Sequence, residues 1–302
     1  MVKNTLVISQ RFLTFHARRL WVLSGAFLVI LLGPLANYYF QINWIQGWYQ
    51  SLGVGKFWFV SPLEGLESIL VAKQLYLPAL IAMLAPVLLA LLLGSVFCSW
   101  VCPISFFSEI LDGIRRKISG RKWLKDRLLL SRRLLWYALL GELTLTMILG
   151  GPVFVFVSPP GLVGRELMTL IFFHTLALEG VILLLVLGMN LVTRRFYCRY
   201  FCPLGATLNL LGSRRKLAVR MDHDRCTACG LCDRRCPLGL SPANGMTASL
   251  YCWNCGECVD ACQSQALSFQ WRSASSEDSP SESVPTSSQK PNIPTETAGF
   301  WQ

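Results

Sequence analysis

The sequence predicts a mostly α-helical membrane protein, in which a four-helix transmembrane bundle precedes a small cysteine-rich α+β domain and a disordered tail. Three observations predict this fold class. Hydrophobic residues make up 53% of the 302-residue chain and gather in runs of about twenty, the length that crosses a bilayer. Eight of the 12 cysteines lie between residues 226 and 262. Residues 273–302 are rich in Ser, Pro, Glu and Thr, and such a composition buries too little apolar surface to fold.

Four apolar runs are each long enough to cross ~30 Å of hydrocarbon as a helix. They are Leu20–Phe40, Tyr76–Phe97, Leu134–Val157 and Ile171–Val192. Buried helices of a soluble protein are the less favoured interpretation, because such helices are shorter and present one polar face. We therefore expect residues 20–217 to form a four-span membrane domain, preceded by an N-terminal segment over residues 1–19.

Basic residues are distributed very unevenly among the segments that flank these runs. The N-terminal segment, the second connection and residues 193–220 after the fourth run together hold 20 Lys and Arg residues, whereas the two other connections hold 3. Positive charge marks the cytoplasmic side of a membrane protein, so both termini are predicted to be cytoplasmic. The net charge of +11 follows from this bias and from contact with anionic lipid heads, so it implies no nucleic-acid partner.

Two cysteine runs, CTACGLCDRRCP and CWNCGECVDAC, lie within residues 218–272. Both have the spacing C-x2-C-x2-C-x3-C, which is typical of bacterial two-cluster ferredoxins. Zinc sites use paired C-x2-C motifs without this triple spacing, and disulfides are disfavoured in a reducing cytoplasm. The spacing therefore predicts a small two-cluster ferredoxin-like domain, with zinc or structural thiols as the weaker alternatives.

Resemblance to the two-cluster ferredoxins implies a crossed assignment of the ligands, in which the fourth cysteine of each run ligates the other cluster. The first [4Fe–4S] cluster takes Cys226, Cys229, Cys232 and Cys262 in this assignment. The second takes Cys236, Cys252, Cys255 and Cys258. Two clusters without a substrate pocket of their own conduct electrons and do not form a reaction centre.

The remaining four cysteines form two C-x3-C-P motifs, Cys98 with Cys102 and Cys198 with Cys202. Positions i and i+4 share one face of a helix, and the following proline breaks it, so each pair is predicted at a helix end. Each motif follows an outside-to-inside run and precedes a basic segment, GIRRKI or GSRRKL, which predicts two parallel two-helix repeats. If the second and fourth helices pack together, the four thiols converge.

Three interpretations of these four thiols stay open. In the first, they jointly ligate a further metal centre, such as another iron–sulfur cluster. In the second, each pair is a redox-active dithiol, since i and i+4 on a helix lie within reach of disulfide geometry. In the third, they are small buried hydrophobic residues that shape a helix end. Duplication in register argues against the third interpretation.

Four apolar runs with two C-x3-C-P motifs, followed by two ferredoxin runs, resemble the membrane quinol-dehydrogenase subunit of periplasmic nitrate reductase systems, the NapH type. The stretches FCSWVCP, SPPGLVGRELM and CGLCDRRCP carry the resemblance, which covers nearly the whole chain up to residue 272. The methylamine-utilisation proteins of the MauN type share this layout, as does the membrane part of the nitrous oxide reductase accessory proteins.

The NapH resemblance implies a multi-pass protein of the bacterial inner membrane that oxidises a quinol from the membrane pool. Electrons then pass to a periplasmic iron–sulfur subunit and on to a terminal reductase such as nitrate reductase. The alternative function is that of a redox accessory factor, which serves the maturation or sensing of another oxidoreductase, as in the methylamine or nitrous oxide systems.

Quinol oxidation releases protons, so its site needs a base, and ionisable groups inside the membrane are the first candidates. Glu142 lies in the third apolar run, and His174 and Glu179 lie in the fourth. We predict His174 and Glu179 as a proton-handling pair and Glu142 as a further proton acceptor. The alternative is that each carboxyl group is protonated and hydrogen-bonded between helices.

Overall fold

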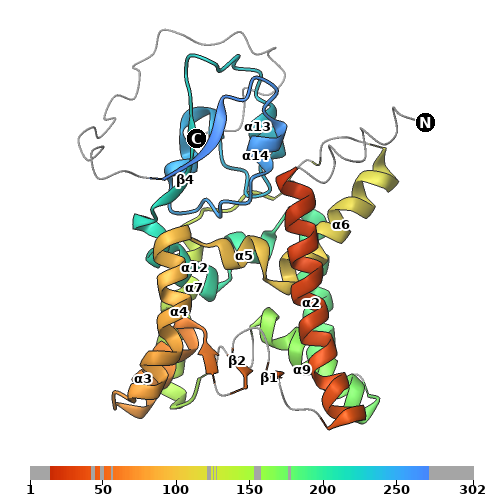
Figure 1. Cartoon of the computed structure of the whole chain (residues 1–302), viewed down its shortest axis with the longest axis vertical. Coiled ribbons are helices and arrows are strands. Elements are labelled where there is room, and N and C mark those ends of the chain that lie inside the picture. Colours follow the sequence, from red (N-terminus) through yellow and green to blue (C-terminus); the bar gives the residue numbers. More distant parts are fainter. Residues whose placement is uncertain are drawn as a thin grey trace.

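The computed structural model describes residues 14–41, 45–47, 51–55, 57–120, 124, 126, 128–152, 158–175 and 178–271. The predicted tail, residues 273–302, and most of the N-terminal segment lie outside the described residues. Figure 1 shows a helical part and a smaller C-terminal domain stacked along the longest axis of the molecule. Helices α2 and α4 run along that axis, and the short helix α5 lies across it just below the C-terminal domain.

The helical part comprises ten described helices and a small sheet. The helices are α2 (Phe15–Phe40), α3 (Pro62–Ala72), α4 (Leu77–Leu93), α5 (Val96–Trp100), α6 (Pro103–Ser119), α7 (Leu134–Leu149), α9 (Pro159–Phe173), α10 (Leu178–Val192), α11 (Phe196–Tyr200) and α12 (Pro203–Leu211). The sheet is antiparallel, in the order β1 (Ile45–Gly47), β2 (Ser51–Val54) and β3 (Phe57–Val60). This sheet lies in the first connection, and the sequence analysis does not foresee it.

The C-terminal domain is bounded by two antiparallel strands, β4 (Leu217–Met221) and β5 (Leu267–Trp271), with Val219 opposite Phe269. Between them lie the short helices α13 (Leu231–Arg235) and α14 (Glu257–Ala261), one after each cysteine run. Three 3-10 turns complete the described elements: η1 (Gly212–Arg214), η2 (Pro242–Asn244) and η3 (Met246–Ala248). The predicted α+β class of this domain agrees with these elements.

The four expected apolar runs are largely helical, but two of them are divided, and in the third run α7 ends at Leu149, where Gly150 takes a φ of +68°. Only α2, among the described helices, is long and apolar enough to cross a membrane unaided, whereas α4, α7 and α10 are shorter apolar helices. The run Tyr76–Phe97 is not one helix, because Gly94 takes a φ of +79° and ends α4. The run Ile171–Val192 is divided because His174 takes a φ of +54° and ends α9. Four apolar helices are therefore present, and four membrane crossings stay a prediction.

The outer surfaces of these four helices are apolar. Trp21 on α2, Leu84 on α4, Ile148 on α7 and Leu184 on α10 are each more than half exposed. Exposed apolar patches of this kind are costly in water and mark surfaces that contact a protein or a membrane.

The two halves of the helical part repeat one order of elements, and each half has three described helices more than the two that the sequence predicts. Ser61 caps α3 and Ser158 caps α9, and each cap is followed by a proline, an arrangement that starts a helix. The apolar helices α4 and α10 follow, then the five-residue helices α5 and α11, and then α6 and α12. The prediction of two-helix repeats is corrected in this respect, because the Ser-Pro segments form helices and not loops.

Candidate iron–sulfur centres

The four cysteines assigned to the second cluster lie together in the structure. Cys236, Cys252, Cys255 and Cys258 line a single pocket in the C-terminal domain. Cys236 belongs to the first run and the other three belong to the second, so the fold assembles the crossed set. Burial raises the pKa of the Cys258 thiol strongly, and the neighbouring thiols raise it further. Four thiols in a pocket that is otherwise mostly apolar suit a [4Fe–4S] cluster, although their role as ligands stays a prediction.

In both cysteine runs, the residues just before and just after the second cysteine have a left-handed backbone conformation. Ala228 and Gly230 flank Cys229 with φ values of +51° and +67°, and Asn254 and Gly256 flank Cys255 with values of +52° and +81°. Such turns point successive backbone N–H groups to one side, as anion-binding loops do. Gly256 is also required by space, since a Cβ atom there would lie 2.7 Å from the Cβ atom of Phe15 on α2.

The cysteines assigned to the first cluster lie nearer the surface. Cys232 and Cys262 pack against the small core formed by Val219, Cys258 and Leu267. Cys226 is partly buried and Cys229 is exposed. Slight burial raises the pKa of Cys262, but the Ser264 hydrogen bond and backbone amides more than offset it, so its pKa is lowered. The surface position makes this quartet the accessible end of the domain.

The four C-x3-C-P thiols converge, as the sequence analysis expects for packed repeats. Cys98, Cys102, Cys198 and Cys202 are all buried and share one core with Cys236 and Cys252. The second cysteine of each motif caps the following helix, α6 or α12. In α12 the Gly205 N–H group donates to the Cys202 sulfur at 3.3 Å. Burial raises the pKa of Cys202 to about 12, against the opposing effect of this N–H group.

Both C-x3-C-P helices are hydrogen-bonded to a ferredoxin run next to a predicted ligand. From α5, the Ser99 hydroxyl donates to the Trp253 carbonyl at 2.8 Å, and the Trp100 indole donates to the Asn254 carbonyl at 3.3 Å. From α11, the Arg199 guanidinium donates to the Pro237 carbonyl at 2.9 Å. These bonds fix the two groups of cysteines relative to each other.

Asn254 is a positioning residue that the sequence analysis overlooks. Its side-chain amide is buried and donates to the carbonyls of Leu93 and Leu217, both at 2.8 Å. It thereby ties the second cysteine run to the end of α4 and to the start of β4. The CWNC stretch offers one signal in retrospect, because asparagine adopts left-handed conformations more readily than other non-glycine residues.

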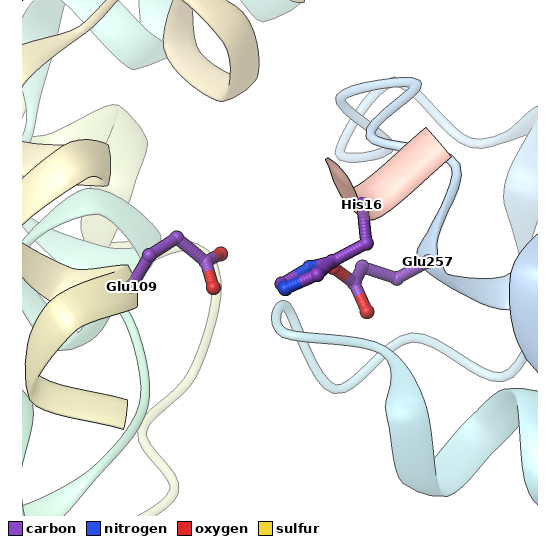
Figure 2. Close-up of side chains that lie close together, drawn as sticks. All are labelled: His16, Glu109 and Glu257. Atoms are coloured by element: carbon purple, nitrogen blue, oxygen red, sulfur yellow. The ribbon is translucent and has the colours of Figure 1, made fainter. Parts of the chain in front are cut away.

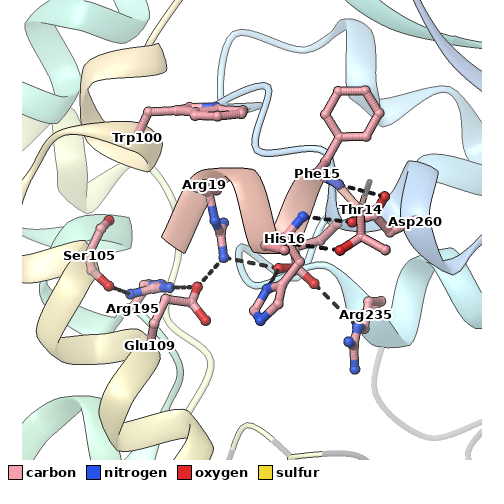
Figure 3. A network of polar contacts seen from close by, with 12 residues as sticks. Thr14, Phe15, His16, Arg19, Trp100, Ser105, Glu109, Arg195, Arg235 and Asp260 are labelled. Atoms are coloured by element: carbon pink, nitrogen blue, oxygen red, sulfur yellow. Dashed lines mark hydrogen bonds and ion pairs between the residues drawn. The ribbon is translucent and has the colours of Figure 1, made fainter. Parts of the chain in front are cut away.

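A buried polar network joins the start of α2 to the C-terminal domain. Figure 2 shows that Glu109 of α6 lies across from His16 of α2 and Glu257 of α14. In the described part of the chain this is the one set of three metal-type ligands whose atoms lie within 4.8 Å of one another. Arginines already occupy the set: Arg19 donates to both carboxylates, and Arg195 donates to Glu109 (Figure 3). We therefore assign it as an ion-pair network and not as a metal site.

Both carboxylates of this network, Glu109 and Glu257, have cationic partners. Burial raises the pKa of Glu257, but the His16 hydrogen bond and the charges of Arg19, His16 and Arg235 outweigh burial and bring it to about 2. Arg235 adds an ion pair to Glu257 at 3.2 Å. From the sequence, Arg19 is only one of the basic residues that indicate topology, because its partners Glu109 and Glu257 are remote in the chain.

The three residues predicted to handle protons have different surroundings in the described structure. The Glu179 carboxylate accepts from the Arg165 guanidinium of α9, at 2.9 and 3.1 Å. His174 is exposed at the end of α9. Glu142 lies on α7, and one of its carboxylate oxygens is buried without a hydrogen-bond partner among the described residues. Their roles stay predictions.

Comparisons with known proteins agree with the cysteine pattern. A family model described as a 4Fe-4S binding domain matches twice, at residues 75–122 and 173–220, and each match contains one C-x3-C-P motif. A model described as a 4Fe-4S dicluster domain matches residues 207–275. No solved structure matches the chain.

Three curated relatives cover much of the chain. The methylamine utilization ferredoxin-type protein MauN of Paracoccus denitrificans is 31% identical over 231 residues, which are 73% of this chain and 77% of MauN. The ferredoxin-type protein NapH of Haemophilus influenzae is 29% identical over 279 residues, 87% of this chain and 91% of NapH. The putative electron transport protein YccM of Escherichia coli is 29% identical over 72% of this chain and 61% of YccM. The chain therefore belongs to the family of ferredoxin-type 4Fe–4S electron-transfer proteins that includes NapH and MauN.

Proposed function

We propose that this protein oxidises a membrane quinol and delivers the electrons toward a periplasmic iron–sulfur subunit and a reductase such as nitrate reductase. One observation carries the proposal. The four C-x3-C-P thiols lie in the same buried core as Cys236 and Cys252, and hydrogen bonds from α5 and α11 join them to the cysteine runs. If these thiols carry a redox group near the membrane, this arrangement would hold it against the ferredoxin domain.

The residues proposed to hold the clusters are the two crossed quartets, and a third centre is proposed at Cys98, Cys102, Cys198 and Cys202. When bound, [4Fe–4S] clusters supply one-electron chemistry at reduction potentials that the protein adjusts. The C-x2-C-x2-C-x3-C spacing of the two runs favours a cluster over a single zinc ion.

Buried arginines compensate the negative charge that thiolates would carry in these sites. Burial raises the pKa of Cys236, and the nearby Arg199 guanidinium acts in the opposite direction. Burial likewise raises the pKa of Cys252, and Arg215 opposes it. Burial of a charge is costly without a counter-charge, so these arginines stabilise the form of each cysteine that binds metal.

A location in the bacterial inner membrane, with four spans and cytoplasmic termini, is part of the proposal. The exposed apolar faces of α2, α4, α7 and α10 support it, because a bilayer covers such faces. So does the excess of basic residues in alternate connections. The two protons that quinol oxidation releases need acceptors, for which Glu142, Glu179 and His174 stay the predicted groups.

A second function, a redox accessory factor for maturation or sensing, is supported by the similarity to MauN, whose name assigns it to methylamine utilization. In this case each C-x3-C-P pair would cycle between a dithiol and a disulfide.

Electron paramagnetic resonance separates the two functions. We expect the wild-type protein to show more than two iron–sulfur centres, and the Cys98→Ser/Cys198→Ser variant to keep only the two ferredoxin clusters. We also expect a short-chain quinol to reduce the wild-type clusters within milliseconds to seconds. Identical spectra in the two proteins, with thiols that oxidise reversibly in pairs, would favour the accessory function. Failure of quinol to reduce any centre would rule out quinol oxidation.

A further inference from the structure

A large apolar cavity lies directly beside the C-x3-C-P cysteines. Its volume is about 450 Å³, which is within the range of sites that bind small molecules. Helices α2 and α4 form its sides, strands β2 and β3 close one end, and α5 and α12 close the other. Of the described residues that line it, only Ser61 carries a polar side chain. Lining residues such as Leu89 and Val29 are also partly exposed, so the cavity opens to the surface, and its apolar lining suits an apolar ligand.

One face of α4 is devoted to this cavity. The α4 residues that line it follow helical spacing: Ala85, Pro86, Leu89, Ala90 and Leu93. Small side chains at Ala85 and Ala90, and at Ala26 on the facing side of α2, leave the space open. The other faces of α4 carry large exposed side chains such as Leu84 and Leu88.

The end of the cavity that α5 and α12 close carries the redox motifs. Val96 and Phe97 precede Cys98, and Val101 precedes Cys102. From the second repeat, Leu204 lies two residues after Cys202. Phe97, Val101 and Leu204 line the cavity and also belong to the core that contains the four buried thiols, so a ligand in the cavity would border that core. Closeness to these cysteines matters for a ligand that exchanges electrons with them, whereas it adds nothing to the binding of an ordinary acyl chain.

We propose that this cavity binds a lipid-soluble quinone, with the isoprenoid chain against α2 and α4 and the ring toward α5 and α12. The identity of the ligand rests on the proposed function, and its location does not. The site differs from the one predicted from sequence, because none of Glu142, His174 and Glu179 is among the residues that line the cavity.

The test is photolabelling of the full-length protein in detergent with a short-chain azidoquinone, followed by mass spectrometry of the peptides. We expect labels on the peptides that carry α4, α5 and α12. The variant Ala85→Trp places an indole in the cavity and should reduce labelling at least about tenfold, since even one methylene changes affinity about that much in an apolar pocket. Ala26→Trp fills the cavity from α2 and should act in the same way. Leu84→Trp adds the same ring to the outer face of α4 and should leave labelling unchanged.

Three outcomes would overturn the location. They are labelling that maps to α9 or α10, labelling that neither cavity-filling variant reduces, and a bound phospholipid that excess quinone does not displace. Iron content and the paramagnetic signals of each variant report whether it has folded. Reduction of the clusters by quinol is measured separately. If the wild type labels in the cavity but no cluster is reduced, quinol oxidation fails while the binding site stands. If quinol reduces the clusters equally in Ala85→Trp and wild type, the site fails while the function stands.

Discussion

Replacing Arg19 with methionine should detach the start of α2 from the C-terminal domain. The Arg19 side chain is 2% exposed and donates to two carboxylates, Glu109 and Glu257, that are themselves buried. Methionine keeps much of the side-chain length but removes the charge. Loss of one partner from a buried ion pair costs about 3–5 kcal/mol, because the remaining charge is left buried without compensation. Arg195 and Arg235 still reach these carboxylates, so we expect the lower end, about 3 kcal/mol.

Hydrogen exchange of the α14 amides, in detergent, measures this change. A loss of about 3 kcal/mol corresponds to about 100-fold faster opening of the contact between α2 and the domain. Arg18→Met is the matched control, because Arg18 is exposed and its loss should cost about 1 kcal/mol at most. Exchange in Arg19→Met that stays within about threefold of the wild-type rate, as for a surface pair, would refute the reasoning.

The remaining predictions concern single positions in the C-terminal domain. Gly256→Ala should destabilise the contact with α2 by about 1–3 kcal/mol, because the new Cβ atom meets Phe15 and the φ of residue 256 is +81°. Gly230 lies in open space, so Gly230→Ala should show only the cost of the positive φ. Equal melting temperatures for the two variants would contradict this prediction. Cys255→Ala should lose iron and acid-labile sulfide while the protein still inserts into membranes, and an unchanged iron content would exclude Cys255 as a ligand. Glu257 has a lowered pKa of about 2, so its contribution to stability is present above about pH 4.5 and is lost as pH falls toward 2. The Glu257→Gln variant should be less stable than the wild type at neutral pH, and it should lack the loss of stability that Glu257 causes between about pH 4.5 and 2. Identical acid-unfolding curves for the variant and the wild type would disprove this role of Glu257.

Several features were open to prediction because they depend on residues close together in the chain. The C-x2-C-x2-C-x3-C runs and the C-x3-C-P pairs are chemical patterns that a few consecutive residues complete, and apolar runs report their surroundings directly. The repeat of the motifs also predicts that the four thiols converge, as they do in the shared core. The additional helices α3 and α9 are signalled in the sequence only by Ser61 and Ser158 with the prolines that follow them, because apolar length does not distinguish these segments from loops.

Other features depend on contacts that no local pattern contains. Arg19 and Glu257 are 238 residues apart in the chain, and only the packing of α2 on α14 makes them partners. The cavity exists because small residues on α2 and α4 face each other, which neither helix reveals alone. The sequence by itself determined which atoms are available for redox chemistry, since cysteine spacing is a covalent property. The tertiary structure decided which thiols share a site, which charges are buried together and where an apolar ligand fits, because burial and proximity arise only when distant segments pack.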